Sequence, residues 1–254
     1  MNALPDSGYD MTMNRKHANI LICQDEATAV NEAADRFACA AVRSVAEHGR
    51  FCVAVSGGNT PKGMYESLAE HHASLVPWYQ TELFFADERC VPPESPESNY
   101  RMVHDLLIST VPIPEVNVHR FEGELSPEIA AECYEQELHK VMGHDPHFDL
   151  IVLGMGSDSH TASLFPYTPA LHVTGRHAVS NYVHKLGVHR LTLTFTPINR
   201  AHSIIILVTG AGKADALAAV MSGDEDVDMH PVQNVNPTHG RLLWIVDCEA
   251  ASKL

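Results

Sequence analysis

The most informative segment of the sequence is FDLIVLGMGSDSHTASLFP, residues 148–166. It begins with a short apolar run, residues 150–153, which predicts a buried strand of a parallel sheet. Gly154 and Gly156 then allow a tight turn where a side chain would intrude. A buried strand that ends in glycines and polar groups is typical of the ligand-binding edge of an open α/β sheet.

The polar groups after this strand have two interpretations. Asp158, His160, Thr161 and Ser163 bring acid, imidazole and hydroxyl groups together, as a reactive site requires. Alternatively, Asp158 caps a helix that begins near Ser159, and His160 is a packed residue among the 17 histidines of the chain. The stretch alone leaves both open, and two further stretches favour the first.

Composition limits the class of protein. The chain has 254 residues with 45% hydrophobic content, which suits one large α/β domain or two small ones. Its 17 basic and 32 acidic residues give a net charge of −15, which argues against nucleic acid or an anionic membrane as the main partner. No apolar run is long enough to cross a bilayer. This net charge does not exclude a small anionic substrate, provided that the few basic residues lie close together at its binding site.

Cysteine and histidine spacing indicates a reduced, cytoplasmic protein without a metal centre. The six cysteines are scattered, with no CxxC pair, and no HExxH or Cys/His cluster occurs. Residues 1–18 lack the apolar core of a signal peptide and predict a polar leader that is a candidate for disorder. Residues 19–254 then form the α/β domain.

Strand and helix patterns alternate along this domain. The alternation predicts a mostly parallel sheet with helices on both faces. Strands are expected at residues 20–23, 51–55, 83–86, 150–153, 190–195, 203–208 and 242–246. Helices are expected at residues 25–48, 61–68, 99–108, 127–141 and 214–221, with Thr60 as the N-cap of the second and Pro61 in its first turn.

A glycine-rich turn between the second strand and its helix is a candidate phosphate site. Successive backbone N–H groups and a helix N-terminus both favour an anion. An ordinary tight turn that needs two glycines is the alternative, and neither a Walker loop nor a GxSxG elbow is present. The turn consists of Ser56, Gly57, Gly58, Asn59 and Thr60.

Charged residues follow three other strands at the same edge of the sheet. Asp87, Glu88 and Arg89 come directly after one strand. Arg89 can donate two hydrogen bonds to an anionic group, and the alternative is an ion pair with its acidic neighbours. Lys213 opens a helix, where a cation is disfavoured by the helix dipole unless it faces an anion. Arg190, at the start of an alternating strand, is a weaker candidate of this kind.

Three stretches together resemble the signatures of the 6-phosphogluconolactonase family, a relative of the glucosamine-6-phosphate isomerases and deaminases. They are VAVSGGNTP, FFADERCVPPESPESNY and DLIVLGMGSDSHTASLFP, and the likeness is collinear from about residue 20 to the C-terminus. The resemblance implies a single α/β domain of modified Rossmann type. It also implies hydrolysis of 6-phosphoglucono-δ-lactone to 6-phosphogluconate in the oxidative pentose phosphate pathway, without a cofactor. Residues 154–159 match the dinucleotide-binding fingerprint GxGxxG only in part, because serine replaces its third glycine. The segment is therefore not expected to bind a nicotinamide cofactor.

The resemblance also implies roles for single residues. His160 matches the catalytic histidine and Asp158 the aspartate of its motif, while residues 56–60, Arg89 and Lys213 match the region around the substrate phosphate. Ser159 departs from the family, which commonly has glycine there. If that position needs a positive φ, serine costs about 1 kcal/mol.

The expected chemistry is attack of water on an activated ester. A neutral His160 takes the proton of the water, and Arg89 or backbone N–H groups stabilise the oxyanion. Two other functions stay open: a sugar-phosphate isomerase or deaminase with Asp87 as its base, and a silent sugar-phosphate-binding protein. The first usually has a glutamate shortly after the histidine, as in HIAFNEP, and this chain has HTASLFP. The expected partner is a small sugar-phosphate lactone, and the protein a monomer or small homo-oligomer.

Overall fold

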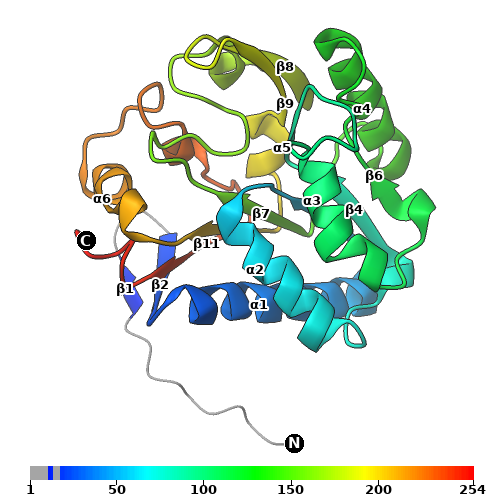
Figure 1. Ribbon diagram of the computed structural model, residues 1–254, viewed down its shortest axis with the longest axis horizontal. Helices are drawn as coiled ribbons and strands as arrows, with labels where there is room; N and C mark the ends of the chain where they lie inside the picture. Colours follow the sequence, from blue (N-terminus) through cyan, green and yellow to red (C-terminus); the bar gives the residue numbers. More distant parts are fainter. Residues whose placement is uncertain (1–10, 14–17) are drawn as a thin grey trace, which may run out of the picture.

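A computed structural model describes residues 11–13 and 18–254 of the chain, and every element below lies in these ranges (Figure 1). Most of the leader predicted over residues 1–18 lies outside the described residues; the described parts are the short strand β1 and Ala18, which begins β2. The helices are α1 (Glu26–His48), α2 (Asn59–Ser67), α3 (Asn99–Leu106), α4 (Pro127–Met142), α5 (Phe195–Asn199) and α6 (Ala214–Ser222). The strands are β1 (Met11–Met13), β2 (Ala18–Cys23), β3 (Phe51–Val55), β4 (Thr81–Phe85), β5 (Asp87–Arg89), β6 (Val118–His119), β7 (Leu150–Gly154), β8 (Ala178–Val183), β9 (Val188–Leu193), β10 (Ser203–Val208) and β11 (Arg241–Asp247).

The central sheet confirms the predicted parallel architecture. Its strands follow the order β1-β2-β11-β10-β7-β3-β4-β6 in the described part of the chain. All neighbours pair in parallel except β1, which is antiparallel to β2. The inner strands β3, β7 and β10 are almost wholly buried, because helices cover a parallel sheet on both sides.

The direction of the chain reverses in the middle of this sheet. From β3 the chain moves outward to β4 and β6, whereas from β7 it moves the other way to β10 and β11. Right-handed crossovers therefore put α1, α2 and α3 on one face and α4 and α6 on the other. In agreement, α1 packs on α2 and α2 on α3, as Figure 1 shows. The loops after β3 and β7 leave toward opposite faces, which opens a crevice between these two strands.

A second, antiparallel sheet has the order β5-β9-β8. The sequence placed residues 87–89 directly after a strand, and in the structure they form β5, because β9 supplies an antiparallel partner that pairs Arg89 with Arg190. The strand expected at residues 190–195 is present as β9, but it ends at Leu193 because Thr194 caps α5. The third strand, β8, has no counterpart among the sequence predictions.

The predicted start of the second helix is wrong, and the helix considered as an alternative after Asp158 is absent. Gly58 has φ 109° and lets α2 begin at Asn59, so that Thr60 lies inside the helix and does not cap it. No helix follows Asp158, because Ser159 and Ala162 have φ of 64° and 47°, which interrupts a right-handed helix. Both departures occur where the backbone adopts conformations that apolar periodicity does not reveal.

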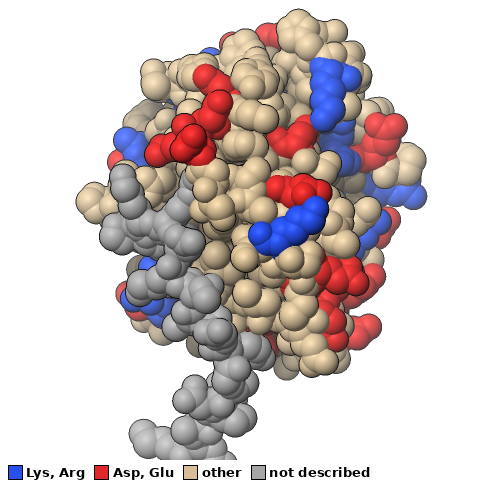
Figure 2. Space-filling model, turned by 90° about the vertical axis from the view of Figure 1, so that its left-hand side faces the viewer, with Lys and Arg blue, Asp and Glu red and all other residues tan. Residues whose placement is uncertain are grey.

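On the face in Figure 2, acidic and basic side chains are interspersed. Among the described residues, no helix is both long and apolar enough to span a membrane. All six cysteines carry free thiols, as their spacing predicted.

Candidate active site

A cavity of about 250 Å³ lies at the carboxyl ends of β3, β7 and β10, where the chain direction reverses. Open α/β sheets bind their ligands at this position. All of the predicted site residues line the cavity except Asp158 and Arg190. The predicted residues that line it are Ser56, Gly57, Gly58, Asn59, Thr60, Asp87, Arg89, His160 and Lys213.

The imidazole of His160 is oriented by a carboxylate and an aromatic ring. Its Nδ1 lies 2.5 Å from Oδ1 of Asp158, and its ring stacks on Phe165 with centroids 4.1 Å apart. Because an ionised carboxylate only accepts hydrogen bonds, Nδ1 carries a proton, and in the neutral tautomer Nε2 then keeps its lone pair. Nε2 makes no hydrogen bond to any described residue. His160 therefore presents a free basic nitrogen at the cavity.

Asp158 does not line the cavity itself but contacts His160, which does. Its Oδ1 also accepts the backbone N–H of His160 at 3.4 Å, and its Oδ2 accepts from Nζ of Lys185 at 2.7 Å. Partial burial opposes ionisation, but the hydrogen bonds and charges of His160 and Lys185 outweigh it and hold the pKa of Asp158 far below its ordinary value. The carboxylate thus both orients the imidazole and orders the turn, two roles that the sequence could not separate.

Gly156 is required by the close approach of this pair. A Cβ on Gly156 would lie 2.1 Å from Nδ1 of His160 and 2.7 Å from Oδ1 of Asp158. The N–H of Gly156 also donates to the carbonyl of His160 at 2.8 Å, which closes the turn. Any larger side chain would displace the imidazole from its partner.

Ser159 occupies the left-handed conformation that its position suggested. Its φ is 64°, a value that favours glycine and costs serine about 1 kcal/mol. Its buried hydroxyl lies 3.0 Å from Nδ1 of His230, and its carbonyl accepts the N–H of Val232. Serine therefore costs some backbone strain at this position, and its hydroxyl connects the turn to the segment before β11.

Asp87 is a buried carboxylate with fixed partners. Its Oδ2 accepts the hydroxyl of Ser163 at 2.7 Å, and its Oδ1 lies 3.3 Å from Nδ2 of Asn99. The same amide of Asn99 donates to the carbonyl of Asp87 at 2.9 Å. These bonds join the second and third signature stretches across the cavity.

Glu88, next to Asp87, has a structural role. Its carboxylate accepts the N–H groups of Arg89, Asn99 and Tyr100 at 2.7–2.8 Å and the hydroxyl of Ser98 at 3.1 Å. Burial raises its pKa above the ordinary value, although these N–H groups oppose the rise. Glu88 thereby fixes the start of α3 and holds Asn99 beside the cavity.

The glycine-rich turn has the features of an anion site. The hydroxyl of Ser56 is buried and has no hydrogen-bond partner among the described residues. A Cβ on Gly57 would lie 1.8 Å from Oδ1 of Asn99, so this glycine is needed for packing. Thr60 lies 3.0 Å from the hydroxyl of Thr209, which ties the start of α2 to the end of β10. An unpartnered donor and the first amides of a helix thus face the same cavity.

Three basic residues differ in how they are held. The ammonium of Lys213 makes no hydrogen bond or ion pair with any described residue, and desolvation lowers its pKa from the ordinary value. Arg89 donates from Nη1 to the carbonyl of Glu97, so it is not paired with an acidic neighbour as one interpretation had it. Arg190 lies directly across from Arg89, and its pKa is lowered by desolvation and by that like charge. Opposed like charges favour an anion between or beside them.

Three contributors to this site were missed in the sequence, and the partner of a fourth residue, Ser163, was not predicted. Asn99 and Ser163 lie within the signature stretches, but nothing in their spacing assigns them to Asp87. Phe165 also lies in such a stretch, and its stacking on His160 needs the turn geometry. Lys185 lies in the β8–β9 hairpin, and no local signal connects it with Asp158.

The fold and the cavity define an α/β protein of the open parallel-sheet class. A His–Asp pair and a glycine-rich turn suited to an anion lie where the strand order of its sheet changes direction. The chain belongs to the family of glucosamine-6-phosphate isomerases/6-phosphogluconolactonase, whose model matches residues 24–244. The resemblance drawn from the three signature stretches is thereby confirmed.

Several relatives of this chain carry the name 6-phosphogluconolactonase. That of Synechocystis sp. is 42% identical over 217 residues, which cover 84% of this chain and 88% of the relative. That of Nostoc sp. is 39% identical over 216 residues, covering 83% and 88%. The solved structure of 6-phosphogluconolactonase from Trypanosoma cruzi superposes with a TM-score of 0.84 at 29% identity, covering 95% of this chain and 98% of that one.

Proposed function

We propose that this chain hydrolyses 6-phospho-D-glucono-1,5-lactone to 6-phospho-D-gluconate, in the oxidative pentose phosphate pathway. The observation that carries the proposal is the meeting of two elements in one cavity: the imidazole of His160, oriented by Asp158, and the anion-type turn with Lys213. A relative that is 42% identical and carries the name 6-phosphogluconolactonase supports it.

In the proposed reaction His160 acts first as a base and then as an acid. Nε2 takes a proton from water as the oxygen attacks the lactone carbonyl, and Asp158 stabilises the imidazolium that forms. When the tetrahedral intermediate collapses, the ring C–O bond breaks and the imidazolium returns the proton to the leaving oxygen. A lactone is an activated ester, so this sequence needs no covalent nucleophile and no cofactor. Arg89 is the proposed donor to the oxyanion.

The phosphate of the substrate is assigned to the opposite side of the cavity. We assign it to the backbone and hydroxyl groups of residues 56–60 and to Lys213, with Arg190 adding positive charge behind Arg89. Ser56 supplies a buried hydroxyl that lacks another partner. Holding the phosphate remotely positions the carbonyl over the water, which lowers the barrier by restricting the reactants.

Lactone hydrolysis and deamination are distinguished by one pair of assays. The protein is expected to hydrolyse 6-phosphogluconolactone, after subtraction of spontaneous opening, and to release no ammonia from glucosamine 6-phosphate. Deamination moves a proton between sugar carbons and needs a free carboxylate base, whereas Asp87 is occupied by Ser163 and Asn99. Ammonia release that matches or exceeds corrected lactone hydrolysis would overturn the proposal, and inactivity toward both substrates would favour a silent binding protein.

Ser159→Gly is expected to leave lactone hydrolysis unchanged or to raise it. The change relieves about 1 kcal/mol of backbone strain at the positive φ and removes one hydrogen bond that contributes a similar free energy. The midpoint of thermal unfolding should therefore move little. His230→Ala is the matched control, because it removes the hydrogen bond and keeps the strain. A large loss of activity in Ser159→Gly would contradict the expectation, and the same loss in His230→Ala would assign that effect to the hydrogen bond.

We also propose that the protein acts in the cytoplasm, as a monomer or small homo-oligomer. Its six free thiols support a reducing compartment. The proposed substrate is a free small molecule, so no macromolecular partner is needed for the reaction.

A further inference from the structure

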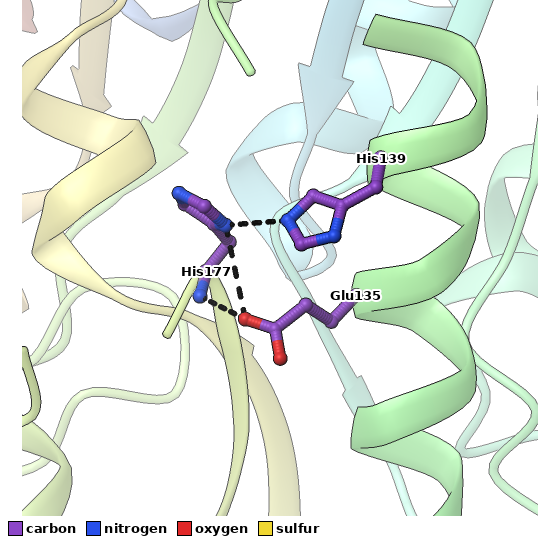
Figure 3. Close-up of side chains that lie close together, drawn as sticks. All are labelled: Glu135, His139 and His177. Atoms are coloured by element: carbon purple, nitrogen blue, oxygen red, sulfur yellow. Dashed lines mark hydrogen bonds and ion pairs between the residues drawn. The ribbon is translucent and has the colours of Figure 1, made fainter. Parts of the chain in front are cut away.

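A second cluster of reactive side chains lies outside the cavity, between α4 and the start of β8. Glu135 and His139 are separated by one helical turn on α4, and both point toward His177, as Figure 3 shows. The three offer one nitrogen or oxygen atom each, and all of these atoms lie within 4.8 Å of one another. None of the three residues lines the cavity that holds His160. The proposed lactone chemistry therefore leaves this cluster unexplained.

The spacing of these atoms matches a metal-binding site. Nε2 of His139 lies 3.0 Å from Nδ1 of His177, which in turn lies 3.7 Å from Oε1 of Glu135. Ligands at about 2.0–2.1 Å from a tetrahedral zinc ion are about 3.4 Å apart. The observed separations fall on either side of that value, so small side-chain rotations are enough to bring the three atoms around one ion.

The surroundings of the cluster support ligation. Arg176 donates from Nε to Oε2 of Glu135, and this leaves Oε1 directed at His177. The backbone N–H of His177 also donates to Oε1, at 2.5 Å. Ligating carboxylates are commonly held by hydrogen bonds of this kind, which fix their orientation. The side chains of Glu135 and His177 are only 13% and 11% exposed, so their positions are set by packing before any ion arrives.

We propose that Glu135, His139 and His177 bind a divalent cation of the zinc type and thereby tie α4 to the start of β8. Two imidazoles and one carboxylate are a ligand set that suits Zn²⁺ and Co²⁺ better than Mg²⁺ or Ca²⁺, which prefer oxygen ligands. The fourth position is open to water or to His144, an exposed residue whose ring stands 5.1 Å from that of His139. No short-range motif marks this site, because its ligands come from two elements far apart in the sequence.

The site is tested with protein that carries no histidine tag and is first freed of metal with a chelator. Titration with Zn²⁺ alone, followed by calorimetry, is expected to show one strong site per chain and a higher melting temperature. His139→Ala is expected to weaken binding at least tenfold and to abolish the thermal shift. His139→Gln is the second variant, because its amide still reaches His177 by a hydrogen bond but is a poor zinc ligand, which separates ligation from folding.

Two control variants make the measurement specific. His104→Ala removes an exposed histidine that also lies beside a carboxylate, Asp105, but has no third ligand, and its binding curve should match that of the unaltered protein. His160→Ala excludes the His–Asp pair of the cavity as the binding site, and it should also retain the strong site. Co²⁺ serves as a spectroscopic probe: nitrogen and oxygen ligands give visible bands without the ultraviolet charge-transfer band of a thiolate, which tests the free cysteines.

The proposal is overturned if the unaltered protein binds no Zn²⁺, or if both His139 variants bind it as tightly as the unaltered protein. Loss of the site in His160→Ala, or a thiolate band with Co²⁺, would also overturn it, because either result assigns the metal to other residues. Retention in both control variants with loss in both His139 variants supports it. These outcomes concern metal binding alone and stand apart from the test of lactone hydrolysis.

Discussion

His160→Ala is expected to lower the catalysed hydrolysis of 6-phosphogluconolactone by about a hundredfold or more while the fold persists. The imidazole presents Nε2 as a candidate proton acceptor at the cavity, with Nδ1 engaged by Asp158 at 2.5 Å. Its loss leaves water to attack without a proton acceptor. The rate is measured by titrating the acid released, with the spontaneous rate subtracted at the same pH.

His71→Ala is the matched control, because His71 is an exposed histidine outside the cavity. Its turnover should equal that of the unaltered protein, and circular dichroism should show the same helix content in both variants. Phe165 loses its stacking partner in His160→Ala, so thermal unfolding is recorded to separate stability from catalysis. Near-normal turnover in a folded His160→Ala would remove His160 from the mechanism.

Lys213→Ala is expected to lower kcat/KM for the phosphorylated lactone by about tenfold to a hundredfold, as for the loss of a hydrogen bond to a charged group. Use of unphosphorylated glucono-1,5-lactone should change far less. The ammonium of Lys213 lines the cavity and has no partner among the described residues, and desolvation already lowers its pKa. A phosphate is therefore the group that would stabilise its charge.

Lys62→Ala provides the comparison for this test, since Lys62 is an exposed lysine on α2 that does not line the cavity. Binding of 6-phosphogluconate and of gluconate, followed by calorimetry, gives a second measure of the same preference. Equal losses on both lactones, or a loss in Lys62→Ala as large as in Lys213→Ala, would contradict the assignment of the phosphate to Lys213.

The central sheet and most of the residues around the cavity were predictable from the amino-acid sequence. Apolar runs predicted β3 and β10 with their observed bounds, because strands buried on both faces need uninterrupted apolar residues. Because parallel sheets bind ligands at the carboxyl edge of their strands, Ser56, Arg89 and His160 were expected at one site. All three line the same cavity. Ser159 was also suspected of a positive φ, which the backbone has.

The contacts between distant segments were visible only in the folded protein. The sequence gives no sign that Ser163 and Asn99 would hold Asp87, or that Lys185 would hold Asp158, because side-chain hydrogen bonds depend on the folded positions of both partners. The strand β5 was missed for a similar reason: three residues form a strand only where a neighbouring edge accepts their hydrogen bonds. The cluster of Glu135, His139 and His177 is the clearest case, because α4 and β8 must pack before its ligands meet. Periodicity reports which face of an element is buried, and packing decides which residues lie opposite it.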